Sequence, residues 1–192
     1  MSDDELAKRG RALEDEYFRQ KDRKLVEKLR QAAAAERARR EMGAQIGSDD
    51  PEMLQELQAL GFTPDTVILL PLVPVVQMAW VDGSVAPAER TLIVELARSR
   101  GVAEGSAADR LLSEWLTGQP GPPVLESAMR LIRGMLAAQP SDHPALTADD
   151  LVRYSESIAE ASGGIFGIHR ISADERALLA TIAAALKGRQ PS

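Results

Sequence analysis

The sequence contains no cysteine, which excludes disulfides, thiolate nucleophiles and cysteine-ligated zinc and is typical of proteins in reducing compartments. It has only two histidines, and neither a zinc-protease HExxH pattern nor a nucleophile-elbow serine occurs. Aromatic residues make up 4% of the chain, so the hydrophobic core must be aliphatic. These absences favour a non-enzymatic protein, and we expect it in the cytoplasm.

Long apolar runs are also absent. Residues 67–81 come closest, but they are only fifteen residues long and contain two prolines, so we predict a buried core element and no membrane span. The first residues, Ser2-Asp3-Asp4-Glu5, are acidic and are followed by no apolar run, so no secretory signal is predicted.

Charge is unevenly distributed along the chain. Residues 1–42 hold 12 Lys+Arg and 10 Asp+Glu, whereas residues 43–192 hold 11 and 19, giving net charges of +2 and −8. A nucleic-acid-binding surface needs clustered cationic side chains, so the acidic part argues against a nucleic-acid partner. Divalent cations or basic protein partners fit this charge better.

The N-terminal segment reads as one long polar helix over residues 3–42. It has no proline and is dominated by good helix formers, and Gly43, Gly47 and Pro51 are expected to end it. We therefore divide the chain into residues 1–46, a charged amphipathic helix with its linker, and residues 47–192, a helical domain.

The apolar residues of this helix form a narrow stripe, because they follow one another in steps of mostly four or seven. Such a stripe favours either of two structures. The helix pairs with its own copy in a coiled coil, or it inserts into a groove on another protein. The candidate partner-binding residues are Leu13, Tyr17, Phe18, Leu25 and Leu29.

Residues 8–30 resemble the inhibitory helix of the mitochondrial ATPase inhibitor family. The resemblance lies in a basic-rich start, the acidic Glu14-Asp15-Glu16, the tripeptide Tyr17-Phe18-Arg19 and leucine-containing basic turns. It implies that the helix wedges between the catalytic subunits of the rotary ATP synthase and blocks ATP hydrolysis. The family's regulatory histidine region and long dimerising helix have no counterpart here.

The rest of the chain predicts an all-α fold of seven or eight helices, because no alternating strand pattern of useful length occurs. Proline, capping and glycine signals delimit the helices, and the apolar segment 71–81 is expected to be the buried central helix. The other expected ranges are 51–60, 87–99, 106–116, 122–138, 147–161 and 172–187.

An internal repeat organises this domain. Residues 85–93 align without a gap on residues 171–179, and each stretch opens a helix that follows another helix and a connection. The domain is therefore predicted to consist of two related helix-turn-helix units.

The repeat carries a second resemblance. Ala79-Trp80-Val81-Asp82-Gly83, with Glu89-Arg90 after it and Ile-Ser-x-x-Glu-Arg in the second half, is similar to the tellurite-resistance protein B (TerB-like) domain over residues 50–188. This resemblance implies an all-helical, non-enzymatic domain that binds calcium through acidic residues at helix ends and is linked to tellurite and other chemical stress.

Four carboxylates are candidate ligands for such a cation: Asp82, Glu89, Glu160 and Glu175. Asp82 closes one helix and Glu89 lies in the first turn of the next, so both could face one loop whose carbonyls complete an oxygen shell. The alternative is that they only cap helices, since an acidic residue at a helix start also compensates the helix dipole. In the second half, Ser162 replaces the counterpart of Asp82.

The sequence thus predicts a TerB-like regulatory or adaptor protein whose N-terminal helix engages a protein partner and whose domain binds calcium. The first alternative is an inhibitor that acts on the catalytic subunits of the rotary ATP synthase. The second is a structural protein that self-associates through its helices.

Overall fold

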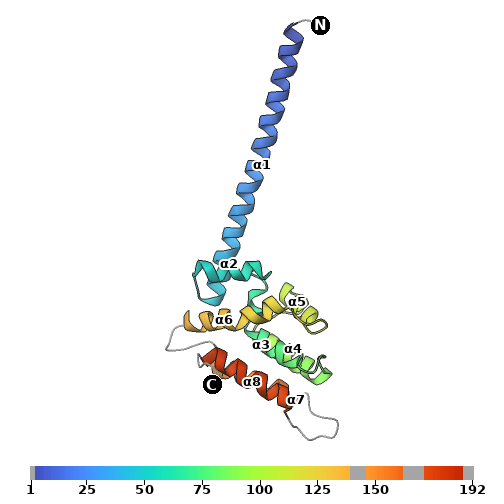
Figure 1. Ribbon diagram of the computed structural model, residues 1–192, viewed down its shortest axis with the longest axis vertical. Helices are drawn as coiled ribbons and strands as arrows, with labels where there is room; N and C mark the ends of the chain where they lie inside the picture. The colour runs from blue at the N-terminus through green and yellow to red at the C-terminus, as the bar shows by residue number, and fades with distance from the viewer. Residues whose placement is uncertain (1–2, 139–145, 162–170, 188–192) are drawn as a thin grey trace. The chain divides into compact units, whose positions relative to one another are not determined.

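The computed structural model describes residues 3–138, 146–161 and 171–187, with side chains described from Glu16 onward. Within these ranges the chain forms eight α-helices and one 3-10 helix, and no strand (Figure 1). The predicted all-α class is therefore confirmed. The chain divides into two compact units, residues 1–40 and residues 41–192.

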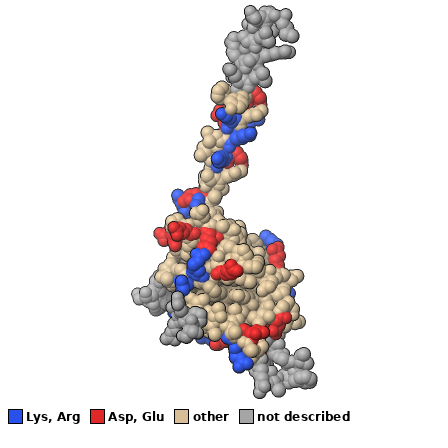
Figure 2. Space-filling view, viewed as in Figure 1, with Lys and Arg blue, Asp and Glu red and all other residues tan. Residues whose placement is uncertain are grey.

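The first unit is the greater part of helix α1 (Asp3–Ile46). Its helix-forming residues are joined by side-chain pairs four residues apart, such as Gln20 with Glu16 at 3.2 Å and Gln31 with Glu27 at 3.0 Å. Cationic and anionic side chains alternate along it in Figure 2. The described side chains from Glu16 to Arg37 are all exposed.

Helix α1 extends beyond its predicted end. The sequence indicated a stop at Met42, but the helix continues to Ile46 and ends at Gly47, which has a φ of 69°. Ser48 donates its backbone N–H to the Gly43 carbonyl at 3.1 Å, a Schellman-type helix end. A Cβ at Gly43 would lie 2.6 Å from the Ser48 carbonyl oxygen, so Gly43 permits this turn and does not break the helix.

In the second unit, α2 (Pro51–Ala59) matches its predicted range, whereas the apolar segment that follows does not. Residues Val67–Leu72 form a 3-10 helix, η1, and the α-helix α3 covers only Val73–Ala79. Pro71 therefore lies inside η1 and does not begin the α-helix. The proline in the first turn of α3 is Pro74, at a position where the helix needs no backbone N–H donor.

Helix α3 is the centre of the core, as predicted. Val73, Val75 and Val76 have no exposed surface, and α3 packs against α4 (Pro87–Ser99), α6 (Pro122–Ala138), α7 (Ala148–Ala161) and α8 (Ala173–Lys187). Helix α8 also packs directly against α6 and α7, and Figure 1 shows α8 below α6. The two predicted helix-turn-helix units, α3–α4 and α7–α8, are in contact through α3 with α7 and α4 with α7.

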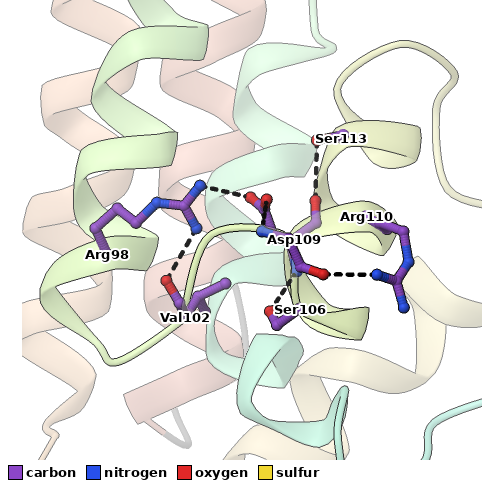
Figure 3. Close-up of polar contacts among 7 residues, drawn as sticks. Arg98, Val102, Ser106, Asp109, Arg110 and Ser113 are labelled. Carbon is purple, nitrogen blue, oxygen red and sulfur yellow. Dashed lines mark hydrogen bonds and ion pairs between the residues drawn. The ribbon is translucent and has the colours of Figure 1, made fainter.

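The connection from α4 to α5 (Ala107–Trp115) is held by a polar network centred on Asp109 (Figure 3). Its carboxylate accepts from Arg98 at 2.7 Å and from the Gly105 backbone N–H at 2.8 Å. The hydrogen bond from Gly105 has the largest effect on the pKa of Asp109, which it lowers, and the bond from Arg98 lowers this pKa further. Ser106 caps α5 by accepting from the Asp109 N–H at 3.1 Å. These bonds fix the loop structurally.

Candidate functional site: two buried glutamates and an apolar cavity

The first half of the predicted cation site lies around the α3–α4 turn. Helix α3 is capped at Trp80, and the chain turns through Asp82 and Gly83, whose φ is 80°. Asp82 is exposed. Glu89 lies in the first turn of α4 and is only 3% exposed, and its carboxylate accepts from the Ala86 backbone N–H at 2.6 Å.

The second half repeats this arrangement at the start of α8. Glu175 is 2% exposed and accepts from the Ser172 backbone N–H at 2.6 Å, the same length as in the first half. Ser172 in turn accepts from the Glu175 N–H at 3.1 Å, which completes the predicted S-x-x-E capping box. The gapless alignment of the two halves therefore matches equivalent buried side chains.

The two glutamates interact electrostatically. Burial raises the pKa of Glu89 to about 7, and the charges of Glu175 and Asp82 contribute further to this rise. The Ala86 hydrogen bond acts in the opposite direction, because it favours the ionised carboxylate. Near neutral pH, Glu89 is thus poised between its protonated and ionised forms.

Two of the candidate calcium ligands, Glu89 and Glu175, are engaged in helix capping. Both buried glutamates hold backbone N–H groups at their own helix starts, which is the geometry of capping. Glu160 is exposed in the last turn of α7. Among the residues whose placement is described, no group of three or more acidic, histidine or cysteine side chains is arranged to hold a metal ion. In this arrangement Glu89 and Glu175 cap their own helices, and calcium binding by the four carboxylates stays a prediction.

The candidate partner-binding residues lie on α1 in the first unit. Tyr17, Phe18, Leu25 and Leu29 are 54%, 60%, 56% and 61% exposed, and the side chain of Leu13 lies outside the described side chains. The Tyr17 and Phe18 rings meet edge to face at 5.9 Å. Val26, which the sequence analysis did not single out, is 45% exposed on the same helix.

An apolar cavity of about 530 Å³ in the second unit was not predicted from the sequence. Side chains from the end of α1, η1, α6 and α7 line it, together with Arg100, the C-cap residue of α4, and Tyr154 of α7. Arg100 donates to the Tyr154 hydroxyl at 2.9 Å, and its guanidinium lies 5.3 Å from the centre of the ring. These two residues are 54 positions apart, and neither belongs to a recognisable motif.

Comparisons of the chain with protein-family models, curated proteins and solved structures found no match. Among the described helices, none is both long enough and apolar enough to cross a membrane.

Proposed function

We propose that this protein is a non-enzymatic adaptor that presents α1 to a second protein. The supporting observation is where large apolar side chains are exposed. Five of the six exposed large hydrophobic residues in the described part of the chain lie within thirteen residues of α1, and the sixth, Leu92, is only 37% exposed. Clustered exposed apolar residues mark interaction sites, whereas scattered ones are ordinary.

The stripe formed by Phe18, Leu25 and Leu29 favours a partner of different sequence over a second copy of this helix. These residues follow steps of seven and four, and Asp22 occupies the position between Phe18 and Leu25 on the same face. In an in-register parallel pair, Asp22 would meet Asp22 within the apolar contact, at a cost in free energy. A groove that offers a cation or hydrogen-bond donors to Asp22 avoids that cost.

For the second unit we propose a TerB-like scaffold with a role in the cellular stress response, in the cytoplasm. The Asp82-Gly83 turn and the paired glutamates of the two halves support this proposal, together with the sequence resemblance. Calcium binding by Asp82 and Glu89 is the regulatory part of the same proposal.

The adaptor proposal is tested by a double substitution, Phe18→Ser with Leu25→Ser, in the full chain. The matched control is Gln20→Ser with Glu27→Ser, which changes two exposed residues with the same spacing on the opposite face of α1. Proteins captured from the native lysate are quantified by mass spectrometry, and sedimentation velocity reports the oligomeric state. We expect a defined protein to be captured by the wild type and the control and at least tenfold less by the stripe variant.

Two other results would contradict the adaptor proposal. Capture that is equal for all three proteins would show that the stripe binds no partner. A wild-type dimer that the stripe variant converts to a monomer, with no partner lost, would instead support the structural, self-associating alternative.

The exposed Tyr17–Phe18 pair supports a second candidate function, inhibition of the rotary ATP synthase. Both rings of the inhibitor-like tripeptide are accessible for insertion between catalytic subunits. In that case a peptide of residues 1–42 slows ATP hydrolysis by purified synthase, and Tyr17→Ala with Phe18→Ala relieves the inhibition. Unchanged hydrolysis at saturating peptide would rule out this candidate.

A further inference from the structure

Cationic side chains flank the apolar stripe of α1 on both sides. Lys21 and Lys28, seven residues apart, follow one edge of the stripe. Arg23, Arg30 and Arg37, also in steps of seven, follow the other edge. With about 3.6 residues per turn, both rows lie within a third of a turn of the stripe. All five side chains are exposed, so they can extend past the stripe toward a bound surface.

The glutamates of the same segment lie on the opposite side of the helix. Glu16 accepts from Gln20 at 3.2 Å, and Glu27 accepts from Gln31 at 3.0 Å. Residues 16–31 hold six cationic and three acidic side chains, so the segment carries an excess of positive charge. Among the side chains that the structure describes, Lys28 forms no ion pair on α1. The excess charge is thus placed at the borders of the stripe.

The lysines also repel one another in the free helix. Lys21, Lys24 and Lys28 follow in steps of three and four, the spacing at which side chains on a helix are neighbours. Like charges at this spacing destabilise an isolated helix. Anionic groups on a bound surface would relieve the repulsion, so the charge pattern favours an acidic surface beside the stripe.

We propose that the partner of α1 is a protein with an apolar groove and with Asp or Glu side chains along both rims. The groove floor receives Phe18, Leu25 and Leu29. Carboxylates on one rim face the lysines, and carboxylates on the other face the arginine row, which can bind them in bidentate fashion. This inference rests on the adaptor function proposed above and adds the chemistry of the partner.

An anionic bilayer offers the same sign of charge but fits the stripe less well. Asp22 lies between Phe18 and Leu25 on the same face, and its carboxylate would lose water among acyl chains. Helices that lie in a membrane interface carry a large apolar face, whereas this stripe is narrow. A groove on a protein can place a hydrogen-bond donor against Asp22.

The test uses the full-length protein and the partner that it captures from its native lysate, once that partner is identified and purified. The rim variant is Lys21→Gln with Lys28→Gln. The matched control is Gln20→Glu with Ala34→Glu, which changes the net charge equally on the opposite side of α1. Association rates are measured by surface plasmon resonance at low and high salt, and circular dichroism establishes that each variant is as helical as the wild type.

We expect the rim variant to associate at least about fivefold more slowly than the wild type at low salt, because rim charges act mainly on the association rate. The control should associate like the wild type. High salt should bring both close to the rate of the rim variant, since it screens exposed charges. A carbodiimide, which joins an amine to a carboxylate in contact with it, should link Lys21 or Lys28 to Asp or Glu of the partner.

The outcomes separate this inference from the adaptor proposal. Equal association rates for the wild type and the rim variant, with binding lost in Phe18→Ser with Leu25→Ser, would overturn the acidic rims and leave the adaptor function standing. Failure of the wild type to capture any partner would contradict both. Cross-links between two copies of this chain, or sedimentation with phosphatidylglycerol vesicles without cross-links to a protein, would assign the surface to a second copy or to a membrane and contradict the proposed partner.

Discussion

The starts of α4 and α8 are built on the same plan, yet they differ at one atom. In both helices a buried glutamate in the first turn accepts a 2.6 Å hydrogen bond from the backbone N–H three residues earlier. At α8 the cap residue is Ser172, whose hydroxyl returns a bond to the glutamate's N–H. At α4 the cap residue is Ala86, which has no side-chain oxygen to return one.

This difference shows what each part of the capping box contributes. Helix α4 begins without a side-chain acceptor and relies on Pro87, whose ring presets the helical φ, and on Glu89. Helix α8 has the complete reciprocal box. Glutamates are buried in both halves despite this difference, so a buried glutamate in the first turn of the second helix is the shared feature of the repeat.

The largest expected effect comes from the buried charge of Glu89. Its pKa is about 7 in the folded protein and near 4.5 in an exposed glutamate, so the folded state holds the proton more tightly. Both states are protonated below pH 4.5, and the free energy of unfolding falls as pH rises toward 7, by about 3 kcal/mol in total. Glu89→Gln still accepts from Ala86, so this variant should lose the pH dependence and be more stable than wild type at pH 8.

Urea unfolding from pH 5 to pH 8 measures this effect. Asp109 and Asp150 do not interfere, because their pKa values are lowered from 3.8 and both stay ionised in this window. The matched control is Glu95→Gln, an exposed position on α4, which should leave the slope of stability against pH unchanged. Parallel curves for wild type and Glu89→Gln would show that Glu89 does not titrate in this range.

Calcium tests whether the paired carboxylates do more than cap. A cation at Asp82 and Glu89 would replace the proton of Glu89, so the predicted site requires a calcium-induced rise in melting temperature that is larger at pH 8 than at pH 6. Ligand at a hundred times its Kd stabilises by about 2.7 kcal/mol. Asp82→Asn with Glu89→Gln should abolish the rise.

Capping alone gives a different result. The wild type would then melt at the same temperature with calcium and with chelator, and the cation site predicted from the sequence would be lost. Magnesium at equal ionic strength is the control for general screening of the acidic surface.

Local signals predicted most of the fold. Ser106 caps α5, Thr147 and Asp150 cap α7, and Ser172 caps α8, each at the position expected, because capping depends on a few neighbouring residues. The errors at Gly43 and around Pro71 have a different origin. There the helix type and end depend on packing within the second unit, which buries Met42, Ile46 and η1 and which a sequence pattern does not contain.

The candidate functional sites also differ in whether a local sequence signal predicted them. Glu89 and Glu175 were found because the repeat places them at equivalent positions, although alignment did not indicate that both would be buried. The cavity at Arg100 and Tyr154 had no local signal, since residues from five distant segments meet there only in the folded chain. Whether the four carboxylates share a cation remains a prediction.

The smallest expected effect comes from exchanging the two cap residues. Ser172→Ala removes the bond to the Glu175 N–H and should lower the free energy of unfolding by about 1 kcal/mol. Ala86 has the extended backbone of a normal cap, with φ −67° and ψ 153°, so Ala86→Ser can supply the missing acceptor to the Glu89 N–H. This substitution should raise the free energy of unfolding by about 0.5–1 kcal/mol.

Urea denaturation at pH 5, where Glu89 is largely protonated, measures the effects of both substitutions without the larger pH effect. Ala88→Ser, exposed two residues into α4, is the control for serine in the first turn and should give no gain. If Ala86→Ser stabilises no more than Ala88→Ser, then Pro87 and Glu89 already satisfy the start of α4, and the missing hydroxyl costs that helix nothing.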